Sequence, residues 1–244
     1  MSLNERTRLP ELIDDPTLDP AEHRLALKGL ERINRWSLAE DILWNPIQGL
    51  ALCPRQDRPP GDGPTRDRPL RVLDIACGAG DLAIGLWKRA KRSGFSIDID
   101  GADISPVAVK SALGRVQDKK VDVRFFELDV LNEKIPSGYD VIMTSLFLHH
   151  LEKEDAVSIL ARMSEAAGEM ILVNDLVRSR WGFVLAYVGP RILTRSCVVH
   201  NDALLSVRAA FQPEEIKNLA EEAGLSGFEI SRHWPCRFLL KWKK

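Results

Sequence analysis

The sequence lacks the features that identify proteins with a structural zinc site and nucleic-acid-binding proteins. Its four cysteines are far apart and form no C-x-x-C pair, which argues against a structural zinc site. They are Cys53, Cys77, Cys197 and Cys236. The formal net charge is −1, with lysine and arginine spread along the chain, so the basic face of a nucleic-acid-binding protein is not expected.

A long apolar run is also missing. The longest apolar stretch, residues 181–188, is far shorter than the roughly 20 residues that a membrane-spanning helix requires. The chain starts with polar and acidic residues rather than with an apolar signal segment. We therefore expect a cytoplasmic protein without a transmembrane segment, and the sequence leaves open whether it is a monomer or a homodimer.

The N-terminal part of the sequence predicts a helical arm over residues 1–53. Asp19 and Pro20 are typical of a helix start, and residues 37–40 (SLAE) have the pattern of a capping box that opens a second helix. Because the residue before a proline disfavours the helical conformation, this second helix should end before Pro46. Residues 54–69, rich in proline and charge, should form a flexible linker.

From residue 70 to the C-terminus, runs typical of strands alternate with helical segments. The predicted strands are residues 71–75, 96–103, 121–127, 139–145, 170–174, 228–232 and 237–241, and the predicted helices are 80–91, 106–118, 153–167 and 213–224. The last two strands are too close for a helical crossover, so they should pair as an antiparallel hairpin. The pattern predicts an α/β domain over residues 70–244, with a doubly wound, mostly parallel seven-stranded sheet.

The first predicted strand leads into a glycine-rich turn, DIACGAGDLA, which begins at Asp74. Gly78, Gly80 and Ala83 form a G-x-G-x-x-A pattern that suits NAD and S-adenosylmethionine equally. The carboxylate of Asp74 would repel a pyrophosphate but attract the ammonium of an amino-acid group. This charge favours S-adenosylmethionine.

Two further acids follow the second and third predicted strands. Asp103 is placed to accept hydrogen bonds from ribose hydroxyls, and Asp129 to read an adenine amino group. Asp103 suits NAD and S-adenosylmethionine equally. Asp129, together with the C-terminal hairpin, which is the mark of the methyltransferase variant of this fold, favours S-adenosylmethionine over NAD.

Several segments carry a family resemblance. The chain resembles the class I S-adenosylmethionine-dependent methyltransferases in five segments, which occur in the order VLDIACGAG, GADIS, FELDVL, YDVIMTSLFLHHL and ILVNDL. Within this class, LFLHHL, NDLVRSRWGFVLA and SVRAAFQPEE resemble a group of bacterial small-molecule methyltransferases found beside type III polyketide synthases, thought to act on phenolic or quinol-like products. The ubiquinone and menaquinone C-methyltransferases look like more distant relatives. The resemblance implies a Rossmann-like methyltransferase fold, with S-adenosyl-L-methionine as cofactor and S-adenosyl-L-homocysteine as product.

The resemblance also implies a set of cofactor-binding residues. The methionine end would be bound by Asp74, Ala76, Cys77, Gly78 and Gly80. Asp103 and Ile104 would bind the ribose, and Asp129 and Val130 the adenine. Ser145 would line the site beneath the sulfonium. The family's first glycine is Ala76 here, a small residue that still permits close approach.

Two histidines are the candidate catalytic residues. Methyl transfer is an in-line displacement, so the protein mainly aligns the reactants. A phenol, with a pKa of about 10, also benefits from a general base. His149 and His150 follow the fourth predicted strand, and we predict that one of them is this base; alternatively, both pack against the helix that begins near Lys153. We expect no metal, because the Asp/Asp/Asn grouping of catechol-type enzymes is missing.

Residues 177–205 should form an inserted helical cover. The stretch from residue 181 to 188 is apolar on all sides and bracketed by arginines. It fits a lid over an apolar substrate pocket, packing in a core or dimer, or a helix at a membrane surface, so weak contact with a membrane surface stays open. Substrate contacts are predicted for Arg35, Asp175, Trp181 and His200.

These observations predict an S-adenosylmethionine-dependent methyltransferase of secondary metabolism that acts on an apolar, aromatic small molecule. O-methylation of a phenolic or quinol-like, polyketide-type compound is preferred. The alternatives are C-methylation of a quinone or phenol ring, an NAD-dependent oxidoreductase, and a protein that binds S-adenosylmethionine without catalysis.

Overall fold

The computed structural model describes residues 3, 5–15, 17–52 and 68–244. Cys53 and nearly all of the predicted linker, residues 54–67, lie outside this part of the chain. The helices are α1 (Pro20–Trp36), α2 (Ala39–Leu52), α3 (Asp81–Arg92), α4 (Pro106–Lys119), α5 (Lys153–Ala166), α6 (Arg180–Leu193), α7 (Cys197–Ala209) and α8 (Pro213–Glu222). Two short 3-10 helices are η1 (Leu12–Asp14) and η2 (Leu148–His150).

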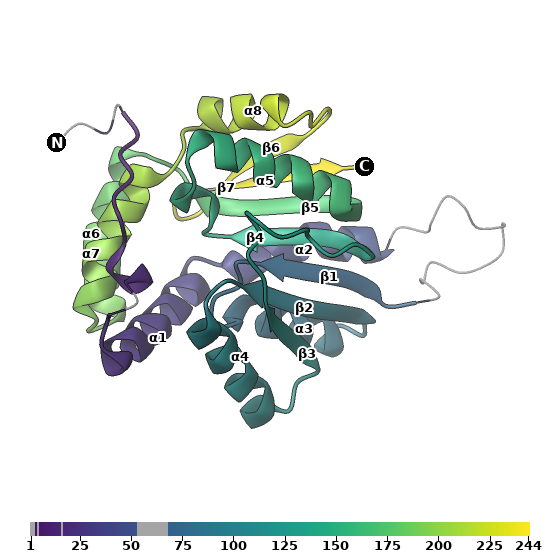
Figure 1. Ribbon diagram of the computed structural model, residues 1–244, viewed down its shortest axis with the longest axis horizontal. Helices are drawn as coiled ribbons and strands as arrows, with labels where there is room; N and C mark the ends of the chain where they lie inside the picture. Colours follow the sequence, from purple (N-terminus) through teal and green to yellow (C-terminus); the bar gives the residue numbers. More distant parts are fainter. Residues whose placement is uncertain (1–2, 4, 16, 53–67) are drawn as a thin grey trace. The chain divides into compact units, whose positions relative to one another are not determined.

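The strands form one sheet, which confirms the predicted fold class. They are β1 (Leu70–Ile75), β2 (Ile97–Asp103), β3 (Val123–Glu127), β4 (Tyr139–Ser145), β5 (Ala167–Leu176), β6 (Glu229–His233) and β7 (Arg237–Lys243), in the spatial order β3-β2-β1-β4-β5-β7-β6. β1 pairs in parallel with β2 and β4, and β2 with β3, whereas β6 and β7 form the expected antiparallel hairpin (Figure 1).

The described residues fall into two compact units. The first unit comprises Met1–Ala39, Ser145–Ala161 and Val173–Lys241, and the second unit Glu40–Thr144, Arg162–Leu172 and Trp242–Lys244. α1 therefore belongs to the first unit, whereas nearly all of α2 belongs to the second.

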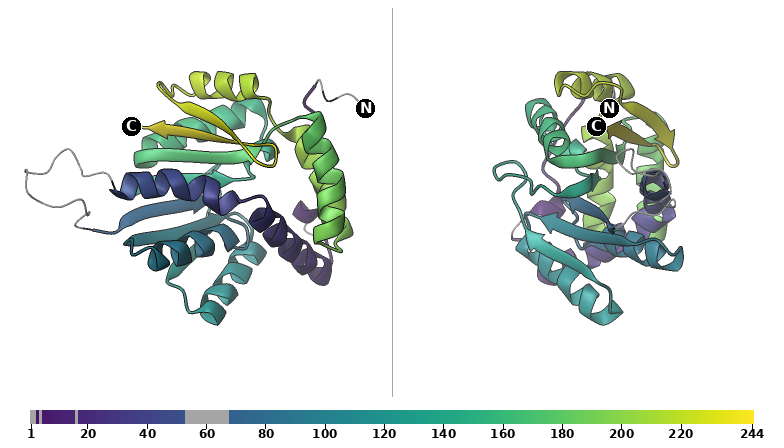
Figure 2. Two further views of the ribbon diagram at one scale, coloured as in Figure 1. Left: turned by 180° about the vertical axis from the view of Figure 1, so that it is seen from behind. Right: turned by 90° about the vertical axis from the view of Figure 1, so that its right-hand side faces the viewer.

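In the second unit, α2 lies along β1, as the left view of Figure 2 shows. The prediction that this helix ends before Pro46 is wrong, because α2 continues through the proline to Leu52. A proline inside a helix costs about 3 kcal/mol. Leu43 and Ile47 are buried on this helix, and at about 1.5–3 kcal/mol each their burial offsets that cost.

The predicted capping box is also absent from the described residues. The backbone N–H of Ser37 donates to Ile33 O (2.8 Å) and its hydroxyl to Asn34 O (3.2 Å), so Ser37 ends α1 instead of opening α2. The predicted start of α1 is confirmed, since the Asp19 carboxylate accepts from the N–H groups of Ala21 and Glu22. One N-cap signal was correct, and the other was overridden by the local end of α1.

In the first unit, α6 and α7 run side by side, and α1 contacts both (Figures 1 and 2). Their shared core includes Ala26, Val198 and Val199, with Leu30 and Ile33 packed against it. Thr194 lies against Gly29 of α1 so closely that a Cβ at this glycine would stand 2.7 Å from its hydroxyl oxygen. In the described part of the chain, no helix combines the length and apolar character needed to cross a membrane.

Candidate functional site

The turn that follows β1 lies at the point where the strand order of the sheet reverses. β1 is hydrogen-bonded to β2 on one side and to β4 on the other, and in open α/β sheets ligands bind at the carboxyl ends of strands at such a point. Ala76, Gly78 and Gly80 all have positive φ angles, of 53°, 56° and 72°. This left-handed backbone brings the chain around tightly before α3 begins at Asp81.

Asp103, at the end of β2, holds this turn in place. Its Oδ2 accepts from the backbone N–H of Gly78 (2.7 Å), and its Oδ1 accepts from the N–H of Ser105 (2.9 Å). The carboxylate thus links the glycine turn to the start of α4, which has Ser105 as its N-cap. Since each carboxylate oxygen has a second lone pair, Asp103 retains the capacity to accept from ribose hydroxyls.

Gly80 and Gly101 are needed because an aromatic ring occupies the space beside them. A Cβ on Gly80 would stand 2.3 Å from Phe125 Cζ, and one on Gly101 would stand 2.4 Å from Phe125 Cε1. Gly78 is different, since a Cβ there would meet no atom within 4 Å in the described residues. Gly80 is therefore required for packing, while Gly78 leaves open space at the turn.

Asp74 is a buried carboxylate without an internal counter-charge. It is 1% exposed, and its Oδ2 has no hydrogen-bond partner among the described residues. Burial, and then the negative charges of Asp81 and Asp103, raise the pKa of Asp74 well above its usual value. A buried acid of this kind has a large free energy to gain from a cationic ligand group. The ammonium of a bound methionine moiety fits this requirement.

The residues predicted at the ribose and adenine also lie in the second unit. Ile104 is 64% exposed, which suits an apolar residue that covers a flat ligand surface. Asp129 Oδ1 accepts from the N–H groups of Leu131 and Asn132, so its side chain orders the turn after β3. Val130 is buried, and its carbonyl accepts from Arg162 (2.5 Å).

Ser145, the last residue of β4, belongs to the first unit and is tied to its neighbouring strand. With the Asn174 amide oriented so that both its ends are satisfied, Asn174 accepts from Ser145 Oγ (2.9 Å) and donates to Phe238 O (3.3 Å). The backbone N–H of Leu146 also donates to Asn174 O (2.9 Å). These bonds fix the loop that leads from β4 to the two histidines.

The two predicted catalytic histidines lie in η2, and the structure distinguishes them. His149 is buried, and its Nδ1 donates to Asp175 Oδ1 (2.7 Å) while its Nε2 faces Glu11 Oε1 (3.7 Å). Burial opposes the positive charge, yet Asp175 and Glu11 outweigh it and raise the pKa of His149 to about 10. Burial and the neighbouring charge of His149 lower the pKa of His150 to about 4.

These pKa shifts do not favour either histidine as a general base at neutral pH, and the predicted catalytic role stays a prediction. A base must be unprotonated and have a pKa near the working pH. His149 is protonated and paired, whereas His150 is neutral but only weakly basic. Asp175, predicted to contact substrate, is 1% exposed and orients His149 by accepting from its ring and its backbone N–H (3.1 Å).

The other predicted substrate residues are spread over three helices of the first unit. Arg35 is exposed near the end of α1, Trp181 is 75% exposed near the start of α6, and His200 on α7 bonds through Nε2 to Thr194 O (2.9 Å). Within the described residues, no hydrogen bond or ion pair joins any two of these side chains. Their role as substrate contacts, like that of Asp175, stays a prediction.

Glu11 is the polar residue of this region that the sequence analysis missed. It faces both histidines from a segment far earlier in the chain, and its side chain is 9% exposed. Only the tertiary structure reveals Glu11, because the fold brings its segment of the chain next to the two histidines. Arg6 donates to His149 O (3.0 Å) and Leu151 O (2.6 Å), and so holds the N-terminal segment against η2.

Comparison with known proteins finds relatives that are methyltransferases. Residues 72–168 match a family model described as a methyltransferase domain. The chain is 27% identical to the demethylmenaquinone methyltransferase of Thermus thermophilus, over 65% of this chain and 75% of the relative. It is 28% identical to the ubiquinone/menaquinone biosynthesis C-methyltransferase of Azotobacter vinelandii, over 63% and 65% of the two chains. A ubiquinone biosynthesis O-methyltransferase of Dechloromonas aromatica is 28% identical, over 49% and 50%. The matches to the latter two thus span less than two thirds of those relatives.

Among solved structures, the plantazolicin methyltransferase BpumL, in complex with SAH, superposes with a TM-score of 0.64 at 16% identity, over 93% of this chain and 90% of that one. At this identity the likeness shows the fold alone. It agrees with the strand order and with the antiparallel C-terminal hairpin described above.

Proposed function

We propose that this chain, a class I methyltransferase by its fold and by the methyltransferase domain in residues 72–168, transfers the methyl group of S-adenosylmethionine to an apolar, hydroxylated aromatic small molecule. The observation that carries the proposal is the buried carboxylate of Asp74, whose Oδ2 has no partner in the described residues, beside a left-handed turn at the switch point of the sheet. A dinucleotide would bring a pyrophosphate to this carboxylate, whereas S-adenosylmethionine brings an ammonium.

The residues of the second unit supply the cofactor contacts in this proposal. Asp74 binds the ammonium, the open space at Gly78 admits the ligand close to the backbone, and Asp103 accepts from the ribose hydroxyls. S-adenosylmethionine supplies an activated methyl group on a sulfonium. The protein's task is then to hold the nucleophile in line with that group, which is the largest contribution available to such a step.

An apolar substrate is supported by the exposed surface of α6 in the first unit. Trp181, Val184 and Val188 follow one another at helical spacing and are 75%, 49% and 44% exposed. A contiguous apolar surface is typical of a site that contacts an apolar ligand, a partner or a membrane. The names of two relatives refer to menaquinone and ubiquinone, which are apolar ring compounds.

Oxygen is the methyl acceptor that we propose first, and a ring carbon is the second candidate. The ring-carbon candidate is supported by the relative named as a C-methyltransferase, and the oxygen candidate by the relative named as an O-methyltransferase. In both cases we propose that alignment, rather than a histidine base, drives the reaction, because His149 is already protonated and His150 is too weak a base.

The first test is a calorimetric titration with S-adenosylhomocysteine, with NAD in a parallel cell. Binding of S-adenosylhomocysteine without binding of NAD supports the proposal, and the reverse result overturns it. The second test incubates the protein with S-adenosylmethionine labelled in its methyl group and a panel of alkylated phenols and quinols. NMR of the labelled product then distinguishes a methoxy group from a ring methyl group. Cofactor binding without turnover on any compound would identify a non-catalytic binding protein.

A further inference from the structure

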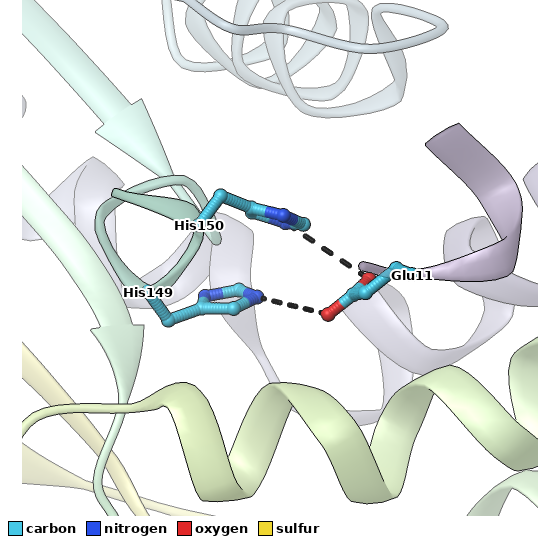
Figure 3. Close-up of side chains that lie close together, drawn as sticks. All are labelled: Glu11, His149 and His150. Carbon is cyan, nitrogen blue, oxygen red and sulfur yellow. Dashed lines mark ion pairs between the residues drawn. The ribbon is translucent and has the colours of Figure 1, made fainter. Parts of the chain in front are cut away.

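The first unit gathers two imidazoles and a carboxylate that the proposed reaction does not use. Figure 3 shows Glu11 from the N-terminal segment pointing toward the rings of His149 and His150 in η2. One ligand atom from each of the three residues lies within 4.8 Å of those of the other two. We propose that Glu11, His149 and His150 bind one divalent transition-metal ion of the Zn²⁺ type.

The donor set has the right chemistry for such an ion. Two histidine nitrogens and one carboxylate oxygen form a ligand set that zinc uses in sites with three protein ligands, where a water or another oxygen occupies the fourth position. The surroundings exclude most bulk water, since the side chains of Glu11, His149 and His150 are 9%, 4% and 30% exposed.

The distances between the histidine nitrogens and the Glu11 carboxylate oxygens fit ligands of one shared ion better than direct hydrogen bonds. His149 Nε2 lies 3.7 Å from Glu11 Oε1, and His150 Nε2 lies 4.0 Å from Glu11 Oε2. Both separations exceed hydrogen-bond length. Two ligands on a tetrahedral zinc ion stand about 3.3 Å apart, given bonds of about 2.0–2.1 Å. Because no two of the three ligand atoms are more than 4.8 Å apart, the cluster needs to contract by at most about 1.5 Å to close on an ion.

The other ring nitrogen of His149 is held by a hydrogen bond, whereas a carboxylate lies near that of His150 beyond hydrogen-bond length. His149 Nδ1 bonds to Asp175 Oδ1 (2.7 Å), which leaves Nε2 directed at Glu11. His150 Nδ1 lies 3.6 Å from Asp14 Oδ2, with its Nε2 directed at the same glutamate. A carboxylate that holds the second ring nitrogen is the usual support of a metal-binding histidine, because it fixes the tautomer and the ring orientation.

Glu11 is held in place independently of the histidines. Ser206 Oγ donates to Glu11 Oε1, and the two backbone N–H groups that follow, those of Leu12 and Ile13, donate to the Asp202 carboxylate (2.9 and 3.0 Å). Oε2 keeps its lone pairs for a metal. The site therefore requires little reordering of the backbone, and a bound ion would attach the N-terminal segment to η2.

The test uses the full-length protein, freed of any affinity tag and stripped with a chelator. Titration with Co²⁺ should give one equivalent per chain with visible absorption bands of a low-coordinate site, and Zn²⁺ should displace it. Glu11→Gln and His150→Ala should each weaken Co²⁺ binding by at least 10–100-fold, as the loss of a ligand costs no less than the loss of a supporting group. His233→Ala, a histidine of β6 outside the cluster, is the matched control and should bind as the unaltered protein does.

Two results would overturn the proposal. The first is a Glu11→Gln protein, folded by circular dichroism, that binds Co²⁺ as tightly as the unaltered chain. The second is a cobalt spectrum dominated by thiolate charge transfer, which would assign the ion to cysteines. Since His149 is buried and its removal can unfold the chain, the partly exposed His150 provides the second variant. None of these outcomes depends on methyl transfer, so the proposed function and this site fail independently.

Discussion

Asp74 and Asp175 are two buried carboxylates, each 1% exposed and each one residue before the end of its strand, β1 and β5, yet their surroundings are opposite. Asp175 accepts from the His149 ring, the His149 N–H and the Leu176 N–H, and its pKa is lowered because these groups outweigh the effect of burial. The Oδ2 of Asp74 has no partner in the described residues, and burial raises its pKa.

The comparison separates a positioning residue from a binding residue. Burial alone destabilises a charge, so a buried carboxylate is retained either because the protein pairs it or because a ligand does. Asp175 is of the first kind and holds His149. Asp74 is of the second kind, and sites with such unpaired groups are where ligand binding is expected.

The largest effect is expected from breaking the internal pair. Asp175→Ala leaves the buried cation of His149 without its nearest counter-charge, which should lower the free energy of unfolding by about 3–5 kcal/mol. Urea denaturation at neutral pH measures it. Asp155→Ala, an exposed acid of α5 in the same unit, should change stability by less than about 1 kcal/mol. Equal effects of both substitutions would remove Asp175 from its role as the support of His149.

Asp74→Asn should have the opposite pattern. It removes a buried negative charge that Asp81 and Asp103 repel, so the ligand-free protein should be at least as stable as the unaltered chain. Loss of a charged hydrogen bond to the ligand should weaken S-adenosylhomocysteine binding by about 1.5–3 kcal/mol. Denaturation and calorimetry on the same preparation measure both quantities. If the variant lost stability but kept full affinity, Asp74 would be a structural residue like Asp175 and not a ligand-binding residue.

The affinity for S-adenosylhomocysteine should also depend on pH through Asp74. The ligand's ammonium favours the ionised carboxylate, so binding lowers the raised pKa of Asp74 toward its ordinary value. The affinity should therefore rise with pH, by at most tenfold per unit, until the pH passes the pKa of Asp74 in the free protein, and then level off. Asp81 and Asp103 face the same carboxylate, and the control is Asp74→Asn, in which the rise of affinity with pH should be lost. An unchanged slope in this variant would assign the pH dependence elsewhere.

Features that depend on local sequence could be predicted, whereas features that depend on tertiary contacts could not. The period of apolar residues located every strand to within a few positions, and the N-cap at Asp19 was correct because these signals are local. The continuation of α2 through Pro46 was missed because burial in the tertiary structure offsets the local penalty. Asp74 could be identified from its place at the end of a predicted strand, beside the glycine-rich turn. The pairing of His149 with Glu11 could not, since no spacing in the sequence links residues so far apart.

The smallest effect tests the turn that carries Asp74. Ala76 has a φ of 53°, a left-handed conformation that costs a residue with a Cβ about 1–2 kcal/mol. Ala76→Gly removes that strain at the expense of a more flexible unfolded chain, so urea denaturation should show a net gain of about 0.5–1 kcal/mol. Gly78→Ala is the matched reverse change, because its φ is 56° and a Cβ there would meet no described atom within 4 Å. It should lose about 1 kcal/mol from backbone strain alone. If Ala76→Gly instead destabilised the chain, the methyl group of Ala76 would be contributing packing to the turn that exceeds its strain.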